Sequence, residues 1–268
     1  MEWKDKKVLV FGTGLSGIGA AGLLERVGAC PLLYDGNEKV KEEQVRAKLP
    51  EGSRARIFIG KMDSRVLEGI TLAVLSPGVP TDLPEVEQIR EAGIPIWGEV
   101  ELAYENSRGD VLAITGTNGK TTTTALVGEI MKHHQEHVFV VGNIGSPYTD
   151  AALDTTDDSV AVAEISSFQL ETVVRFHPRV SAITNITPDH LNRHHTMEEY
   201  IRVKESITKN QVLDVKRNPK LQEKENINNC AVKGVSVRIL LFFVKKYSFF
   251  VVTGESRFWK SRKNHKKL

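Results

Sequence analysis

The chain has 268 residues, with 36 lysines and arginines against 34 aspartates and glutamates, and 40% of its residues are hydrophobic. This is ordinary globular composition, and the length suffices for about two domains. The two cysteines, Cys30 and Cys230, exclude a disulfide framework and a four-cysteine zinc site and suit a reducing cytoplasm. We expect neither a signal peptide nor a membrane span, because the first apolar run passes at once into a glycine turn.

The first predicted unit is a strand, a helix and a second strand at residues 7–11, 18–27 and 31–34. Its turn has the spacing GxGxxG, carried by Gly12, Gly14 and Gly17. Such a turn lets a pyrophosphate approach the backbone, and Asp35 follows the second strand, where an acid can accept hydroxyl groups of a nucleotide. The motif predicts nucleotide binding, and a purely structural turn is the alternative.

A further strand at residues 72–75 runs into the loop SPGVP at 76–80. Loops at the carboxyl ends of strands bind ligands in open α/β sheets, although a plain loop with two prolines fits this segment equally well. A short strand follows at 94–97, and the sequence from Gly98 to Asp110 reads as a helical connector. We therefore place a domain boundary near Gly98.

The second unit opens with a strand at 111–114, the turn GTNGKTTTT at 116–124 and a helix at 122–132. In such a turn backbone N–H groups and the helix N-terminus face phosphate oxygens, Lys120 adds a cation and Thr121 offers a hydroxyl to Mg²⁺. The spacing departs from the general P-loop pattern, and a turn before a threonine-capped helix is the alternative. The motif predicts ATP binding.

Three more strands, at 138–141, 160–165 and 180–183, end in polar residues, as a parallel sheet with a site at its carboxyl edge requires. Glu164 is the first candidate for a Mg²⁺ ligand, and Asp189 and His190 reach the same edge. We interpret His194 and His195 as a solvated helix start, since nothing supplies further zinc ligands.

A helix at 197–209 then places Tyr200 and Lys204 on one face. On spacing alone, Lys204 reads as a surface lysine.

From Val212 onward, fourteen lysines and arginines stand against four acids, whereas the first 211 residues hold 22 bases and 30 acids. This tail also contains the apolar runs LLFFV and SFFVV, which charged residues interrupt. A basic tail that binds nucleic acid or a membrane is one reading. A shifted reading frame or a mispredicted gene end is the other, and we favour it because the charge balance reverses and these apolar runs appear.

Eight segments taken in order resemble the Mur ligases of peptidoglycan synthesis, in particular the D-glutamate-adding branch: FGTGLSGIGAA, SPGVP, GEVEL, GTNGKTTTT, GNIG, EISSFQLE, NITPDHLNRH and YIRVKESI. The resemblance runs from about Lys6 to Gln211. It implies that ATP phosphorylates the carboxylate of UDP-N-acetylmuramoyl-L-alanine and that the amine of D-glutamate attacks the acyl phosphate. The cofactors would be ATP and Mg²⁺.

The resemblance also implies the roles of individual residues. Lys120, Glu164, His190 and Lys204 would be catalytic, and Thr121, Glu164, His190 and a carbamylated Lys204 would hold metal. ATP would contact Gly116, Thr117, Asn118, Gly119, Lys120, Thr121 and Thr122. The UDP-linked substrate would contact Leu15, Ser16, Asp35, Gly36, Gly78, Asn143 and His190.

The expected fold is α/β, with a Rossmann-like UDP-substrate domain at 1–97, an incomplete P-loop ATPase-type parallel-sheet domain at 98–211 and a frameshift-derived or disordered tail at 212–268. We expect a cytoplasmic monomer without nucleic-acid partners or stable membrane insertion. Two alternatives stay open. One is a non-catalytic UDP-sugar or nucleotide-binding module. The other is an NAD-dependent oxidoreductase, which takes GxGxxG at face value and leaves Glu164 and His190 unexplained.

Overall fold

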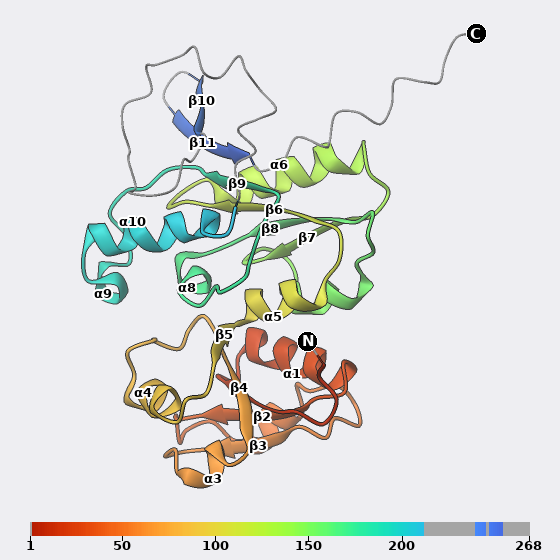
Figure 1. Ribbon diagram of the computed structural model, residues 1–268, viewed down its shortest axis with the longest axis vertical. Coiled ribbons are helices and arrows are strands. Elements are labelled where there is room, and N and C mark those ends of the chain that lie inside the picture. The colour runs from red at the N-terminus through yellow and green to blue at the C-terminus, as the bar shows by residue number, and fades with distance from the viewer. Residues whose placement is uncertain (1, 212–238, 245–246, 254–268) are drawn as a thin grey trace.

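The computed structural model describes residues 2–211 and two strands at 239–244 and 247–253. The described chain forms two sheets with their helices, one built from the first hundred residues and one from those that follow (Figure 1). Within these residues, no helix combines the length and apolar character needed to cross a membrane.

The first sheet is parallel, in the order β3-β2-β1-β4-β5, which is a Rossmann-like arrangement. Its strands are β1 Lys7–Phe11, β2 Cys30–Asp35, β3 Arg56–Ile59, β4 Ile70–Leu75 and β5 Ile96–Gly98. The helices are α1 Leu15–Arg26, α2 Glu42–Arg46, α3 Ser64–Leu67 and α4 Pro84–Glu91. Val8, Leu9 and Val10 are wholly buried, as expected for a central parallel strand covered on both faces.

The second sheet has the order β10-β11-β9-β6-β8-β7, and its last four strands are parallel. Those four are β6 Asp110–Thr115, β7 Val138–Gly142, β8 Val160–Glu164 and β9 Val180–Ile183. The helices are α5 Glu99–Asn106, α6 Lys120–Lys132, α7 Tyr148–Ala151, α8 Ser167–Leu170, α9 Leu191–His194 and α10 Met197–Glu205, with 3₁₀ turns at Ala152–Asp154 and Ser206–Thr208. The α/β fold predicted from the sequence is confirmed.

Two helices begin earlier than predicted, and α10 ends at Glu205, before the predicted end at residue 209. Helix α1 begins at Leu15, three residues early, because Gly14 serves as its N-cap. Helix α6 begins at Lys120, because Gly119 adopts a left-handed conformation with φ 80° and caps the helix there.

Two strands of the tail extend the second sheet. Strands β10 Ile239–Val244 and β11 Tyr247–Thr253 form an antiparallel hairpin, and β11 pairs with β9. The prediction for residues 212–268 is a tail that is frameshift-derived or disordered, and the described strands cover only 239–244 and 247–253 of it. Residues 212–238, 245–246 and 254–268 lie outside the described chain, and the frameshift origin of the tail stays a prediction.

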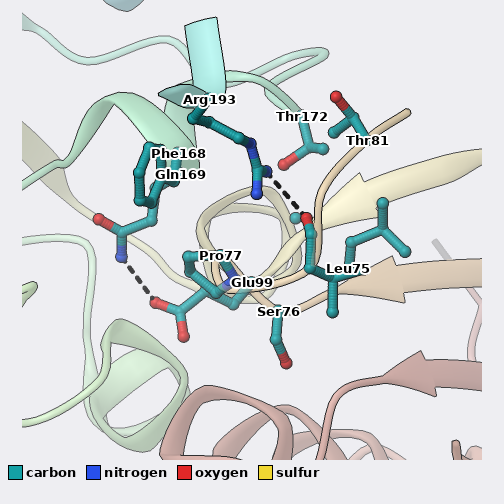
Figure 2. Close-up of a pocket in the computed structure, with 11 residues that line it drawn as sticks. Leu75, Ser76, Pro77, Thr81, Glu99, Phe168, Gln169, Thr172 and Arg193 are labelled. Carbon is teal, nitrogen blue, oxygen red and sulfur yellow. Dashed lines mark hydrogen bonds between the residues drawn. The ribbon is translucent and has the colours of Figure 1, made fainter. Parts of the chain in front are cut away.

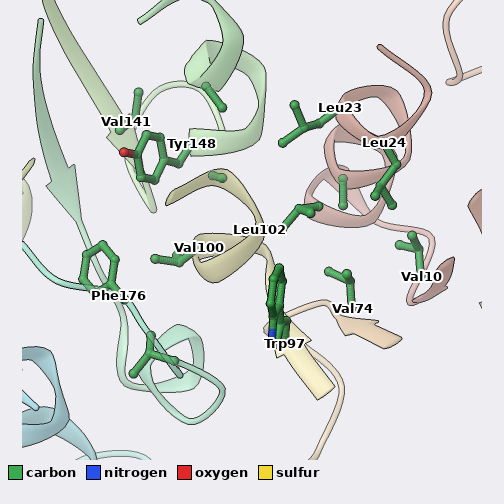
Figure 3. Packing of buried hydrophobic residues seen from close by; sticks show 14 of the residues in the cluster. Val10, Leu23, Leu24, Val74, Trp97, Val100, Leu102, Val141, Tyr148 and Phe176 are labelled. Carbon is green, nitrogen blue, oxygen red and sulfur yellow. The ribbon is translucent and has the colours of Figure 1, made fainter. Parts of the chain in front are cut away.

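The two sheets share one hydrophobic core, with α5 between them (Figure 3). Leu102 lies toward Leu23 of α1 and Trp97 lies toward Val74 of β4, whereas Val100 lies on the side of Phe176 (Figure 3). The Trp97 ring also meets Trp3 edge to face, at 6.0 Å between ring centroids. This packing fixes the position of the first sheet relative to the second.

Candidate active site

The phosphate-loop motif lies between β6 and α6, as predicted. Gly116 has φ 145°, and a Cβ there would lie 1.9 Å from the Thr184 hydroxyl oxygen, so no other residue fits. The first turn of α6 contains no acidic residue, and no side chain of the described chain caps it. Its free N–H groups and the exposed Thr121 and Thr122 suit an anion such as a phosphate.

A second loop, directly after β9, braces the phosphate loop. The carbonyl of Asn118 accepts hydrogen bonds from the Thr184 hydroxyl (2.7 Å) and the Asn185 side-chain amide (2.9 Å). The Asn118 N–H in turn donates to Asn185 Oδ1 at 3.0 Å. The sequence reasoning assigned no role to Thr184 or Asn185, and their position at the end of β9 was the available signal.

Two lysines meet at one carbonyl oxygen of the phosphate loop. Lys120 Nζ and Lys204 Nζ donate to Gly116 O at 2.9 and 2.8 Å. Lys204 is 1% exposed, and its Nζ lies 4.7 Å from the Tyr200 ring centroid. Burial, reinforced by the Lys120 charge and opposed by Asp189, lowers the pKa of Lys204 to about 7. The interpretation of Lys204 as a surface lysine is therefore wrong, because the packing that buries it comes from distant segments.

Glu164 ends β8 and pairs in register with Ile114 of β6, which places it beside the phosphate loop. The side chain is 1% exposed. Its Oε1 accepts a 3.0 Å hydrogen bond from Asn143 Nδ2, whereas its Oε2 is buried and has no hydrogen-bond partner within the described chain. A buried carboxylate oxygen in this condition fits a divalent cation.

No group of three or more histidine, cysteine, aspartate or glutamate side chains forms a metal site in the residues described. Mg²⁺ commonly binds one or two carboxylates and takes its other ligands from water and nucleotide phosphates. Glu164 and the Thr121 hydroxyl are the residues that could hold it.

His190 lies before α9 in a left-handed conformation with φ 52°. Its Nε2 is 3.4 Å from Asp189 Oδ2, its ring centroid is 4.9 Å from that of Phe168, and half of the side chain is exposed. The prediction that His194 and His195 are both solvated is wrong for His194. His194 is 2% exposed, and its Nε2 lies 3.0 Å from the Ser167 hydroxyl, whereas His195 is 69% exposed.

The glycine turn of the first unit leaves room for a ligand at its middle glycine. A Cβ on Gly12 would lie 2.7 Å from Ser76 Oγ and one on Gly17 would lie 1.9 Å from Gly12 O, but Gly14 has no neighbour within 4 Å of that position. Asp35 Oδ2 accepts a 2.6 Å hydrogen bond from the Thr13 hydroxyl. The turn thus allows the close backbone approach that a diphosphate needs.

Four other predicted substrate residues lie at the same edge of the first sheet. Leu15 begins α1 and is 83% exposed, and Gly36 directly follows β2. Gly78, in the loop after β4, has open space where a side chain would be. Ser16 lies beside Leu15 and interacts with the Glu99 carboxylate. Asn143 instead lies at the second sheet, on Glu164.

A small pocket, partly open to solvent, lies between the first unit and the second (Figure 2). The first unit contributes the 76–80 loop, and the second contributes Phe168, Gln169 and Arg193. Glu99 lines it with a side chain that is 2% exposed and accepts a 3.0 Å hydrogen bond from Gln169 Nε2. Burial raises the pKa of the Glu99 carboxyl.

Comparison with known proteins identifies two family domains in the chain. Residues 6–98 match the model of the Mur ligase MurD-like N-terminal domain, and residues 114–233 match the Mur ligase middle domain. The UDP-N-acetylmuramoylalanine--D-glutamate ligase of Lachnospira eligens is 60% identical over 211 residues, which are 79% of this chain and 47% of that protein. The protein of the same name from Lachnoclostridium phytofermentans is 58% identical, over 79% of this chain and 46% of that protein.

Among solved structures, the UDP-N-acetylmuramate:L-alanyl-gamma-D-glutamyl-meso-diaminopimelate ligase from Neisseria meningitides aligns with a TM-score of 0.48 at 16% identity, over 81% of this chain and 74% of that one. The chain spans slightly less than half the length of the curated relatives it matches. Two Mur ligase domain models match in sequence order, and the relatives are highly identical over 211 residues. The chain therefore belongs to the Mur ligase family.

Proposed function

We propose that this chain carries the UDP-substrate and ATP-binding parts of a ligase that joins D-glutamate to UDP-N-acetylmuramoyl-L-alanine in peptidoglycan synthesis. The observation that supports the proposal most is the convergence on the phosphate loop. Lys120 and Lys204 share the Gly116 carbonyl, and Glu164, on the adjacent strand, has a buried and unpartnered carboxylate oxygen. The names of the highly identical relatives support the choice of substrates.

In the proposed reaction the substrate carboxylate takes the γ-phosphoryl group of ATP, and the amine of D-glutamate then displaces phosphate from the acyl phosphate. Lys120 neutralises charge on the β- and γ-phosphates, and the amides of residues 116–122 orient them. Thr121 and Glu164 would hold Mg²⁺, which would supply charge neutralisation for phosphoryl transfer. His190 would hold a second metal near the acyl phosphate, and Asn143 would orient both Glu164 and the muramoyl substrate.

Lys204 takes part as a carbamate in this proposal. Carbon dioxide reacts with neutral amines only, and a pKa of about 7 leaves about half of the Lys204 side chains neutral at pH 7. The Lys204 nitrogen bonds to the carbon of carbon dioxide and releases a proton to solvent, which leaves an anionic carbamate on a buried side chain, beside Lys120 and the proposed Mg²⁺ position. The carbamate would replace a buried cation with a metal ligand.

The UDP end of the substrate is assigned to Leu15, Ser16, Asp35, Gly36 and Gly78. Gly14 supports a diphosphate position there, because its backbone is open to close approach. The proposal implies a cytoplasmic protein, since ATP is its co-substrate, and we expect a monomer.

A second candidate is a binding module without turnover. The residues that support the proposal are ligand-binding residues, and a ligase needs surfaces for D-glutamate and for closure over ATP as well.

Calorimetric titration of the chain with UDP-N-acetylmuramoyl-L-alanine and with Mg·ATP separates the candidates, together with a phosphate-release assay that requires D-glutamate. Binding of both ligands with phosphate release supports the ligase, and binding alone supports the module. Binding of NAD in place of the UDP substrate would overturn both. Lys120→Ala is the control, because it should abolish ATP binding and spare binding of the UDP substrate.

A further inference from the structure

Arg193, in α9, connects the two units through a single guanidinium group (Figure 2). Its Nη2 donates a 2.8 Å hydrogen bond to the Val79 carbonyl, in the 76–80 loop of the first unit. Its Nε and Nη2 also donate to the two carboxylate oxygens of Glu171, at 3.2 and 2.6 Å. Both side chains of the pair are nearly buried, with 12% and 10% exposed. The loop assigned to the UDP substrate is thus bonded directly to the second unit.

The same guanidinium lies against the aromatic ring beside His190. Arg193 Cζ is 4.9 Å from the Phe168 ring centroid, and the centroid of the His190 ring is also 4.9 Å from that of Phe168. The Arg193 N–H donates to the His190 carbonyl at 2.9 Å. A displacement of Arg193 would therefore shift the contacts that the Phe168 ring and the His190 backbone make.

On its other side, Glu171 begins a run of contacts that reaches the phosphate loop. Glu171 Oε1 lies 3.4 Å from His194 Nδ1, and the His194 ring centroid is 5.1 Å from that of Tyr200. The Tyr200 hydroxyl lies 3.1 Å from Thr117 Oγ1 in the phosphate loop. Together with Arg193, these side chains form a continuous series of contacts from the 76–80 loop to the phosphate loop.

Stability alone does not account for this arrangement. Nearly buried ion pairs contribute little net stability, because desolvation offsets most of their attraction. The Glu171 carboxylate by itself would satisfy the charge of Arg193. The additional bond to Val79 has a different effect, because it sets the position of a first-unit loop relative to His190 and Thr117.

We propose that Arg193 is a positioning residue that couples the two ligand sites, so that a ligand at the 76–80 loop strengthens nucleotide binding at residues 116–122. The coupling is reciprocal by linkage, so the nucleotide strengthens binding of the UDP substrate by the same factor. This inference rests on the proposed function for the identity of the two ligands. It adds a residue to which neither the motifs nor the family resemblance assigned a role.

The test compares Arg193→Gln with Arg202→Gln in the full chain. Arg202 pairs with Glu199 on the surface of α10, with 75% of its side chain exposed, and is the matched control. The dissociation constant of UDP-N-acetylmuramoyl-L-alanine is measured with and without a saturating non-hydrolysable ATP analogue and Mg²⁺. We expect the ratio of the two constants to be about fivefold or more in the wild type and control, and within twofold of unity in Arg193→Gln.

The ratio is informative because a purely structural defect raises both dissociation constants by the same factor and leaves their ratio unchanged. Ligand binding with a ratio of one in the wild type overturns the inference, as does an unchanged ratio in Arg193→Gln. If the wild type binds neither ligand, the proposed function fails instead.

Hydrogen exchange of the ligand-free variants then decides the positioning role separately. Loss of a charge-assisted bond should accelerate exchange at residues 76–80 roughly tenfold in Arg193→Gln and leave Arg202→Gln at the wild-type rate. Equal exchange in both variants overturns the role of Arg193.

Discussion

Glu101 is a buried carboxylate that holds backbone N–H groups, and we expect Glu101→Gln to lower the free energy of unfolding strongly. The side chain, in α5, is 0% exposed. It accepts hydrogen bonds from three consecutive backbone N–H groups, those of Val174, Arg175 and Phe176, at 2.8, 2.6 and 3.0 Å. The bonds attach the segment between α8 and β9 to the helix between the two sheets.

The magnitude follows from the geometry. Hydrogen bonds to a charged acceptor contribute about 1.5–3 kcal/mol each, and a buried unpaired donor costs about 1–3 kcal/mol. Glutamine keeps one oxygen acceptor but turns an NH₂ group toward backbone donors, so one bond is lost and the others become neutral. We expect the free energy of unfolding to fall by about 3–5 kcal/mol, and the melting temperature by roughly 10 °C.

Urea unfolding followed by circular dichroism measures this change. Glu105→Gln, one turn further along α5, is the control, because Glu105 makes a 3.4 Å contact with an Arg175 side chain that is 63% exposed. Such a pair contributes less than about 1 kcal/mol. A Glu101→Gln protein within 1 kcal/mol of the wild type would refute the argument.

Three further predictions concern the site. Gly116→Ala should weaken ATP binding about 100-fold, since its Cβ would lie 1.9 Å from Thr184 Oγ1 at φ 145°, and titration with a fluorescent ATP analogue measures this. Burial raises the pKa of Glu99, so the unfolded chain loses this proton near pH 4.5 while the folded chain keeps it. The free energy of unfolding should therefore decline as pH rises above 4.5, and less steeply in Glu99→Gln. Lys204, with its pKa lowered to about 7, should form a carbamate that ¹³C-bicarbonate labels at pH 8, where roughly nine in ten of these amines are neutral.

Each of these predictions has a matched comparison. Gly93→Ala is the control for the phosphate loop, because Gly93 also has a positive φ of 68° but open space around its Cβ position. Equal ATP affinity of the two glycine variants would contradict the steric argument. An identical pH slope in wild type and Glu99→Gln would show that Glu99 is not protonated in the folded chain. Carbamate labelling that survives in Lys204→Met would assign the label to another amine.

Much of the fold was predictable because its signals are local. The apolar runs that became β1, β4, β6 and β8 precede glycine turns or polar loops, and this order along the chain is what a parallel α/β sheet requires. Gly116 and Gly119 were identifiable from spacing, since their conformations serve the turn in which they lie. The family resemblance also needed only the order of short motifs.

The sequence by itself thus determined the element order, the phosphate loop and the candidate residues at each strand end. Only the tertiary structure decided that Lys204 is buried against Gly116 O, that Asn185 braces Asn118, and that Arg193 reaches Val79 of the other unit. The physical reason is sequence separation. These contacts join segments 67 to 114 residues apart, and their burial and charge depend on how two sheets pack around α5, which no local pattern of residues specifies.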